Sequence, residues 1–279
     1  MHDQTTQTEH DMIAQKAEFD HAAALSKVPA ITLGFWIIKI LATTLGETGG
    51  DTVSMTLNMG YLIGTAIFGV IFLGLVIAQI KARGFHPALY WATIIASTTF
   101  GTTLADHVTR SMGIGYTGGS ALLLALVLAS LALWHFSLGR ISTDNIATAK
   151  AEWFYWITIT FSQTLGTALG DWVADTNGIG FGGGALIFGA LIMIVAALYF
   201  WTRVNHVVLF WAAFILTRPL GATVGDFLDK PTDHGGLAFS RPLASAVLTV
   251  AIVALILILP QRAGKKSAVT DKASAPEQA

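Results

Sequence analysis

Four tryptophans in this chain are each followed by a glycine, an aspartate and a second glycine at the same intervals. The tryptophans are Trp36, Trp91, Trp156 and Trp211, spaced 55, 65 and 55 residues apart. Ten residues after each comes a glycine: Gly46, Gly101, Gly166 and Gly221. Fifteen residues after each comes an aspartate (Asp51, Asp106, Asp171 and Asp226), and nine residues further another glycine (Gly60, Gly115, Gly180 and Gly235). This register indicates four tandem copies of one unit, formed by duplicating a pair of units.

Each unit is long enough for two membrane helices. The chain is 53% hydrophobic and 12% charged, about half the charged share of a soluble domain. A membrane span needs roughly 20 apolar residues, and runs of this length suit helices better than barrel strands. We expect an all-α integral membrane protein with eight transmembrane helices. The predicted spans are 28–48, 58–80, 87–106, 116–138, 152–171, 180–202, 206–225 and 238–260.

These spans divide the chain into four repeats between two polar tails. The predicted repeats cover 28–82, 83–140, 150–203 and 204–260. We expect the tails, 1–27 and 261–279, to be mobile because they are polar and lack apolar periodicity.

Positive charges are divided unevenly between the two sides of the membrane. The termini and even-numbered loops hold Lys16, Lys27, Lys81, Arg83, Arg140, Lys150, Arg203, Arg262, Lys265 and Lys266, whereas the other side holds Arg110, Lys230 and Arg241. Lysine and arginine accumulate in cytoplasmic loops, so we expect both termini in the cytoplasm. Two spans per repeat make the four repeats parallel, with pseudo-symmetry about the membrane normal.

Glycines recur where helices could approach closely. Gly46, Gly101, Gly166 and Gly221 each precede a second small residue by four positions, as do Gly60, Gly115 and Gly180, whereas the fourth repeat has Phe239 at the equivalent place. Small residues four apart let helix backbones meet in a membrane, so we predict a packing role for all seven. We predict that the tryptophans are interfacial anchors near the cytoplasmic ends of the first helices.

A polar stripe leads to each aspartate along one helix face. Counting back in fours gives Lys39, Thr43, Glu47 and Asp51, then Thr98, Thr102 and Asp106, then Gln163, Thr167 and Asp171, and finally Arg218, Ala222 and Asp226. Such groups are costly in lipid, so the stripes should face the bundle interior or a wet cavity. We predict that their carboxylates, hydroxyls and amide bind an ion, with the four aspartates as metal ligands.

Two alternatives stay open at this point. Fifteen helical residues rise about 22 Å, so each aspartate could instead end its helix in a wetted turn and cap the next segment. The internal charges Lys39 and Arg218 could neutralise buried carboxylates, or could act as tethers that a bound cation displaces. Glu47 has no acidic counterpart in the other repeats.

Several functional classes are disfavoured. The chain has no cysteine, which removes disulfides and thiolate metal sites, and its formal net charge of −1 argues against nucleic-acid binding. Paired histidines at ligand spacing, nucleophile motifs and phosphate-binding glycine loops are absent from the sequence. We therefore expect neither enzymatic activity nor a cofactor.

The four tandem units resemble a bacterial inner-membrane family built from a tandem "repeat of unknown function", also described as uncharacterised membrane-anchored proteins. The resemblance covers roughly residues 28–260 and rests on the tryptophan, glycine and aspartate positions above. The fourth repeat departs from the pattern with Arg218-Pro219 and a longer acidic segment, "DFLDKPTDHGG". The resemblance implies a fold and a location, and no activity.

The sequence favours a transporter for a hard cation. Carboxylate, hydroxyl and carbonyl oxygens suit magnesium, manganese or calcium, and grouped carboxylates can exchange metal for protons. We expect proton-coupled efflux of a divalent metal, manganese first, through the lipid bilayer. Alternatives are a passive cation channel, an organic-cation carrier, and a membrane-embedded binding or assembly protein. A homo-oligomer is compatible with all of them.

Overall fold

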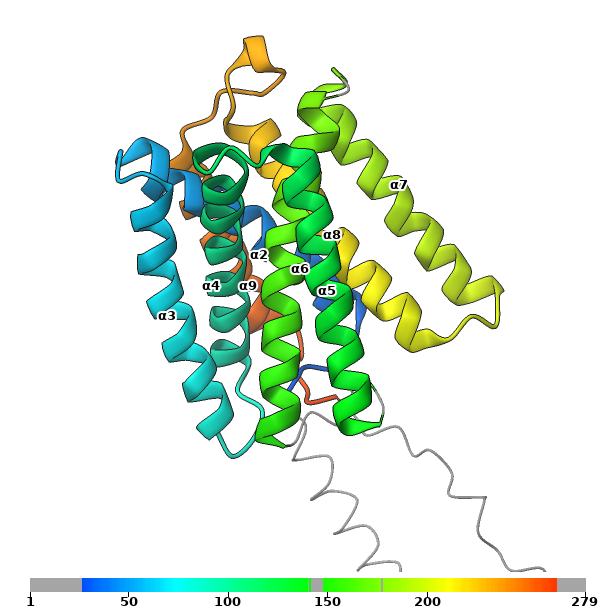
Figure 1. Cartoon of the computed structure of the whole chain (residues 1–279). Helices are drawn as coiled ribbons and strands as arrows, with labels where there is room; N and C mark the ends of the chain where they lie inside the picture. Colours follow the sequence, from blue (N-terminus) through cyan, green and yellow to red (C-terminus); the bar gives the residue numbers. More distant parts are fainter. Residues whose placement is uncertain (1–26, 140, 142–147, 177, 265–279) are drawn as a thin grey trace, which may run out of the picture.

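The computed structural model describes residues 27–139, 141, 148–176 and 178–264, and these form eight long helices (Figure 1). In chain order they are α2 (Leu33–Asp51), α3 (Tyr61–Lys81), α4 (Pro87–Asp106), α5 (Gly115–Leu138), α6 (Ala149–Thr176), α7 (Gly180–Trp201), α8 (His206–Asp229) and α9 (Arg241–Ile258). Short π-helical turns, Thr52–Thr56 and His107–Ser111, continue α2 and α4, and a 3-10 turn, Thr232–His234, follows α8.

The eight predicted helices lie close to the observed ones. The first begins at Leu33 and not at 28, because Pro29 and the extended cap residue Thr32 precede it and the Thr32 hydroxyl accepts from the Phe35 amide at 3.2 Å. Two other helices are longer than predicted: α6 continues past Asp171 to Thr176, and α8 continues past Gly225 to Asp229.

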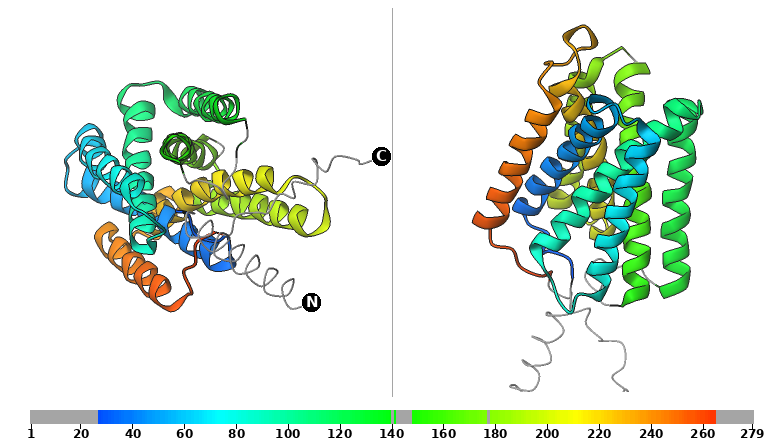
Figure 2. Two further views of the ribbon diagram at one scale, coloured as in Figure 1. Left: turned by 90° about the horizontal axis from the view of Figure 1, so that it is seen from below. Right: turned by 90° about the vertical axis from the view of Figure 1, so that its left-hand side faces the viewer.

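The two helices of each repeat differ in position. The first helices, α2, α4, α6 and α8, contact one another in the cyclic order α2–α4–α6–α8–α2. The second helices lie outside them, each packed on the first helix of the next repeat: α3 on α4, α5 on α6, α7 on α8 and α9 on α2. The view along the bundle shows these pairs around the centre (Figure 2). The fold is therefore an inner group of four helices with an outer helix on each.

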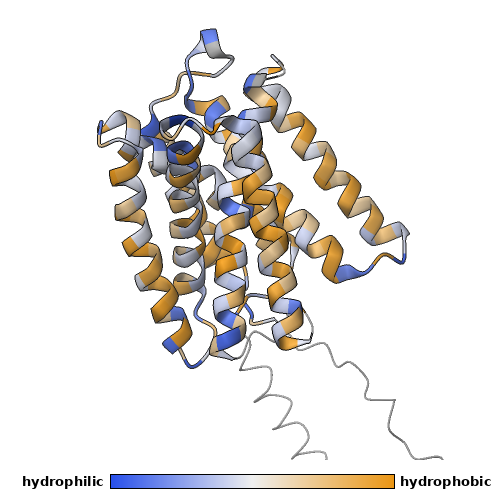
Figure 3. Cartoon of the chain, in the orientation of Figure 1, coloured by the Kyte–Doolittle hydropathy of each residue, from blue (hydrophilic) through white to orange (hydrophobic). Residues whose placement is uncertain are grey.

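Outer helices are apolar and exposed, as the hydropathy colouring shows (Figure 3). Among the described residues, five helices, α3, α5, α7, α8 and α9, are long and apolar enough to cross a membrane. Exposed side chains on the outer helices include Val70, Leu186 and Leu257. The inner helices α2, α4 and α6 carry more threonine and charge, and most of these groups are buried. This pattern is typical of a membrane protein whose polar groups face its own interior.

Glycines allow the inner helices to meet. A Cβ atom on Gly46 would collide with Thr98, and one on Gly101 would lie 3.0 Å from the Gln163 backbone. A Cβ on Gly166 would collide with Arg218, and one on Gly221 with Thr43. Each glycine thus packs against the residue that lies seven positions after the tryptophan of the next repeat.

The predicted packing role of Gly60, Gly115 and Gly180 is wrong. Each has a positive φ, between 68° and 77°, and no heavy atom within 4 Å of the place of a Cβ. They supply the left-handed backbone that turns the chain into the outer helix, which favours glycine. Packing contacts fall four residues later, where Gly64 meets Thr103 and Gly184 meets Thr223.

In the fourth repeat a serine on the outer helix makes the equivalent contact with the inner helix. The Ser245 hydroxyl on α9 donates to the Thr48 hydroxyl on α2 at 2.9 Å. Thr48 stands at the same position in its repeat as Thr103 and Thr223, twelve residues after the tryptophan. The longer loop before α9 therefore shifts the contact from Phe239 to Ser245.

Three of the four tryptophans are buried and are not interfacial anchors, whereas Trp36 is partly exposed. Trp91 and Trp156 are 1% and 2% exposed, and Trp211 is also buried. Their rings pack among the aromatic residues next to them, with Tyr90 and Trp156 centroids 6.1 Å apart and Phe35 and Trp91 centroids 5.6 Å apart. Aromatic burial at the bundle centre, and not contact with lipid head groups, explains why the residue recurs.

The described ends of the chain pair with each other, which corrects the inner edges of the predicted tails. The Ala30 amide donates to the Arg262 carbonyl and the Gly264 amide to the Val28 carbonyl, both at 2.9 Å. Lys27 is buried, and its ammonium lies 2.6 Å from the Glu152 carboxylate. We call this side of the bundle the terminal end and the opposite side the aspartate end. Residues 1–26 and 265–279 lie outside the described residues.

Candidate functional site

The predicted stripes lie buried in the centre of the bundle. Positions seven, eleven and fifteen residues after each tryptophan are at most 2% exposed in all four inner helices. The seven-residue level holds Thr43, Thr98, Gln163 and Arg218; the eleven-residue level holds Glu47, Thr102, Thr167 and Ala222; the fifteen-residue level holds Asp51, Asp106, Asp171 and Asp226. The stripes thus run from the bundle centre toward the aspartate end.

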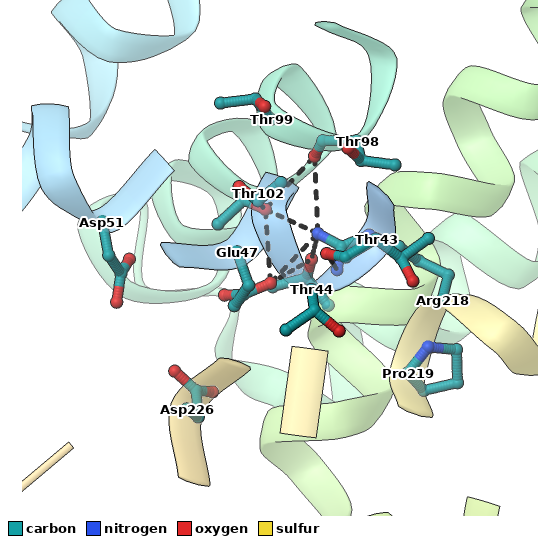
Figure 4. Close-up of polar contacts among 12 residues, drawn as sticks. Thr43, Thr44, Glu47, Asp51, Thr98, Thr99, Thr102, Arg218, Pro219 and Asp226 are labelled. Atoms are coloured by element: carbon teal, nitrogen blue, oxygen red, sulfur yellow. Dashed lines mark hydrogen bonds and ion pairs between the residues drawn. The ribbon is translucent and has the colours of Figure 1, made fainter. Parts of the chain in front are cut away.

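A buried ion pair occupies the middle of these levels (Figure 4). Arg218 Nη2 donates to Glu47 Oε2 at 3.0 Å and to the hydroxyls of Thr102 and Thr167 at 2.5 Å. Arg218 and Glu47 are 0% and 2% exposed. The guanidinium of Arg218, on α8, therefore contacts side chains of the eleven-residue level on the three other inner helices.

The two predicted internal counter-charges differ. Arg218 neutralises Glu47, as one reading of the sequence expected. Lys39 does not neutralise a carboxylate: within the described part of the chain its ammonium contacts the Thr217 hydroxyl at 3.3 Å and lies 4.0 Å from the centre of the Phe214 ring. Lys39 misses the carboxylates because it lies four residues nearer the terminal end than Thr43.

The four aspartates form two pairs, each bridged by a basic residue. Lys230 Nζ lies 2.6 Å from Asp51 and 3.0 Å from Asp226. Arg110 lies 3.0 Å from Asp106 and 2.9 Å from Asp171. Each basic residue joins the aspartate of its own repeat to that of the next. The structure therefore brings the aspartates together two by two.

The alternative in which each aspartate caps a wetted turn is wrong. All four are 1% exposed, and the helix continues past each of them. Asp51 and Asp106 make no side-chain capping bond to the π-helical turns that follow. A π-helical turn inside a helix is often found at a functional site.

A fifth aspartate, missed by the sequence reasoning, joins one of the pairs. Asp229, at the end of α8, offers an oxygen that together with one each from Asp51 and Asp226 forms a set within 4.8 Å of one another. Arg241 Nε lies 3.5 Å from Asp229 and 3.7 Å from Asp51. We call Asp51, Asp226, Asp229, Lys230 and Arg241 the lysine cluster, and Asp106, Asp171 and Arg110 the arginine cluster.

Sequence reasoning also missed Arg110, Lys230 and Arg241, which it treated as loop charges. Arg110 and Lys230 each lie nineteen residues after a tryptophan, so extending the stripes by one more step of four would have found them. Arg241 comes from the start of α9 and offers no such signal.

With every carboxylate counted as ionised, the formal negative charge exceeds the formal positive charge in both clusters. The lysine cluster has three carboxylates and two cations, and the arginine cluster has two carboxylates and one cation. Within the described chain, Asp51 Oδ1, Asp171 Oδ1 and Asp229 Oδ1 are buried with neither a hydrogen bond nor an ion pair. Unpaired buried carboxylate oxygens are costly, so these atoms are the strongest candidates for cation ligands.

Lys230 keeps its charge in this setting. Burial favours the neutral amine, but the neighbouring Asp226, Asp51 and Asp229 outweigh that effect and hold the pKa of Lys230 well above its ordinary value. Lys230 therefore contributes a positive charge to the lysine cluster.

The polar residues at the seven-residue level serve helix contacts. The Thr43 hydroxyl donates to the Thr217 carbonyl at 3.1 Å, and the Thr98 hydroxyl donates to the Ala42 carbonyl at 3.2 Å. The Gln163 amide is buried, and its nitrogen and oxygen have no hydrogen-bond partner among the described residues. Of the predicted ligands, Glu47, Thr102 and Thr167 lie with Arg218, and the aspartates lie in the two clusters. The backbone carbonyls of Thr43 and Thr98 accept from Arg218, both at 3.4 Å.

An apolar cavity of about 430 Å³ lies at the terminal end. Its walls include the four residues that precede the tryptophans: Phe35, Tyr90, Tyr155 and Phe210. The paired chain ends, Val28–Ala30 and Arg262–Gly264, line the rest. The Tyr90 and Tyr155 hydroxyls are hydrogen-bonded to each other at 2.8 Å. The inner helices thus present aromatic residues at one end and carboxylates at the other.

Comparison of the chain with known proteins identifies the family to which it belongs. No curated protein and no solved structure matches the chain. The model of a family described as Repeat of Unknown Function (DUF347) matches four times, at residues 34–85, 89–139, 154–205 and 209–262. Each match contains most of one inner helix and all of the outer helix that follows it. Because these matches cover well over half of the chain, the protein belongs to the family of tandem Repeats of Unknown Function.

Proposed function

We propose that this protein is a carrier for a hard cation in a bacterial inner membrane. In this proposal all eight helices cross the bilayer, and the repeats are related by pseudo-fourfold rotation about the membrane normal. Both termini lie in the cytoplasm, and the aspartate end faces outward. The observation that carries the proposal is the group of buried aspartates with unpaired oxygens in the bundle centre.

The helix arrangement supports eight spans. The inner helices α2 and α4 have 19 and 20 residues, close to the 21 residues of the apolar outer helix α3. At 1.5 Å per residue, 20 residues rise about 30 Å, the thickness of the hydrocarbon core. The inner helices tolerate polar groups because their neighbours shield them from lipid.

The bundle centre supports a carrier better than a channel. On the terminal side of the aspartates, the Arg218–Glu47 pair and the close glycine contacts of the inner helices occupy the centre of the bundle. A channel needs a continuous wet path, whereas a carrier can hold its site closed on one side. Planar-bilayer recording tests this choice: we expect no unitary currents, and currents that Asp171→Asn abolishes would favour the channel.

The ligands support a divalent metal, with manganese as the first candidate. Carboxylates are hard oxygen ligands, and each cluster carries one negative charge in excess. Proton-coupled efflux fits because closely grouped carboxylates bind protons and metal competitively. In this mechanism an entering proton replaces an ion that leaves.

Substituting single aspartates is the direct test of transport. We expect Asp51→Asn or Asp226→Asn to reduce manganese flux in proteoliposomes by at least about tenfold, because each removes a carboxylate from the lysine cluster. Flux is measured with a manganese-sensitive dye inside the vesicles and a pH-sensitive dye in parallel. Asp233→Asn, in the exposed turn after α8, is the matched control. Flux equal to wild type in both cluster variants would remove the proposal.

A further inference from the structure

The two clusters offer different numbers of ligands. In the lysine cluster, three buried aspartates offer oxygens within 4.8 Å of one another. Oxygens on opposite sides of an ion coordinated at 2.0–2.6 Å lie about 4–5 Å apart. The arginine cluster offers two aspartates, both paired with the guanidinium of Arg110. Of the two clusters, only the lysine cluster brings three carboxylates close enough together to share one ion.

The Lys230 ammonium lies where an ion would lie in that cluster. It is a compact charge 2.6 Å from Asp51 and 3.0 Å from Asp226. Asp229 is buried beside them, and neither of its carboxylate oxygens has a hydrogen-bond partner in the described chain. Its Oδ2 lies 3.5 Å from Arg241 Nε, but its buried Oδ1 has neither a hydrogen bond nor an ion pair in the described chain, and this oxygen is a second and independent sign of an ion site.

Charge balance favours a divalent ion in this place. Three carboxylates against Lys230 and Arg241 leave one negative charge in excess. A dication in place of the ammonium makes the cluster neutral, whereas a monovalent ion leaves the excess unchanged. Neutrality matters because an uncompensated buried charge is strongly unfavourable.

Lys230 can leave without unfolding its surroundings. Its carbonyl accepts from the Ala238 amide at 2.9 Å, so the backbone is anchored. Its side chain is 11% exposed, and that of Arg241 is 22% exposed, at the aspartate end. A change of side-chain rotamer would carry the ammonium toward solvent.

We propose that Asp51, Asp226 and Asp229 form the binding site for a hard divalent cation, and that Lys230 is an internal substitute for this ion which the ion displaces. The proposal deepens the proposed function, since it assigns the transported cation to one of the two clusters. Arg110 stays in place and holds the arginine cluster together.

The test measures binding of Mn²⁺ to the purified full-length chain. We expect Lys230→Met to bind one Mn²⁺ about tenfold or more tighter than wild type, because a competing cation is gone. Arg110→Met is the matched control, since it removes the equivalent cation, and it should show no such gain. Adding Asp229→Asn to Lys230→Met should abolish the gain. Equal affinities of wild type and Lys230→Met, or an equal gain in Arg110→Met, would overturn the assignment.

Wild-type protein provides a second measurement if Lys230→Met does not fold. Mn²⁺ should increase modification of Lys230 by a water-soluble amine reagent, read by mass spectrometry, while exposed Lys81 stays constant. Unchanged labelling of Lys230 at saturating Mn²⁺ would contradict displacement. Transport is judged separately: binding without flux would reject the carrier and keep the site, and flux without these binding effects would reject the site and keep the carrier.

Discussion

Replacing Arg218 with methionine is expected to destabilise the folded bundle by about 3–5 kcal/mol, the usual cost of removing one partner of a buried ion pair. Arg218 is wholly buried, and its guanidinium is the only ion-pair partner of Glu47 in the described chain. The substitution leaves the Glu47 carboxylate uncompensated and removes the donor to Thr102 and Thr167. Unfolding of the purified protein in mixed micelles, followed by tryptophan fluorescence, measures the loss.

A double variant separates the charge effect from lost packing. Glu47→Gln on the Arg218→Met background removes the stranded carboxylate, so it should recover part of the lost stability. Arg203→Met, at an exposed position after α7, should leave the unfolding midpoint unchanged. If the double variant lost as much stability as Arg218→Met and Glu47→Gln lose separately, added together, the two residues would not depend on each other.

The positions of the helices could be predicted because they depend on local sequence. Apolar length and turn residues place α4 at Pro87–Asp106, the predicted range. The end of α6 could not be placed in this way, because the prediction treated Asp171 as a terminating residue. In the fold Arg110 from another repeat pairs with Asp171, so the helix can continue to Thr176.

The surroundings of the tryptophans could not be predicted from composition. A tryptophan near a helix end is compatible with lipid head groups or with a protein core, and the neighbours decide between them. Trp91 lies between Phe35 and Tyr90 because the inner helices of successive repeats converge at the terminal end. That convergence follows from the order of the helices around the bundle. The residue spacing within a single helix does not reveal which helices are neighbours.

The candidate site shows the same limit. Four-residue spacing correctly placed Asp51 and Asp226 on buried faces. Their shared partner Lys230 was assigned to a loop, because a lysine after a span is ordinarily a solvated charge. Only the contact between α8 and α2 reveals that the lysine of the fourth repeat reaches the aspartate of the first. Pairing between repeats is a tertiary property that the repeat pattern leaves open.

Replacing Gly221 with leucine is expected to destabilise the bundle by more than about 3 kcal/mol, at or beyond the usual range for overpacking. A Cβ atom at this position would collide with the Thr43 side chain and lie 2.8 Å from the Thr43 backbone carbonyl carbon. Backbone cannot move aside as a flexible side chain can. The contact joins the fourth repeat to the first, so α8 and α2 would have to separate. The yield of monodisperse protein in detergent and its unfolding midpoint measure the effect.

Gly189→Leu is the matched control, because Gly189 lies on the outer helix α7 with no heavy atom within 4 Å of a Cβ. It adds the same apolar side chain and should leave yield and midpoint near wild type. Gly50→Ala should fall between them, since its Cβ would lie 3.1 Å from the Thr102 side chain, a milder overlap than that of Gly221 with the Thr43 backbone. If Gly221→Leu and Gly189→Leu were equally stable, α8 and α2 would not be in close contact. The cyclic arrangement of the inner helices, which brings Lys230 to Asp51, would then be wrong.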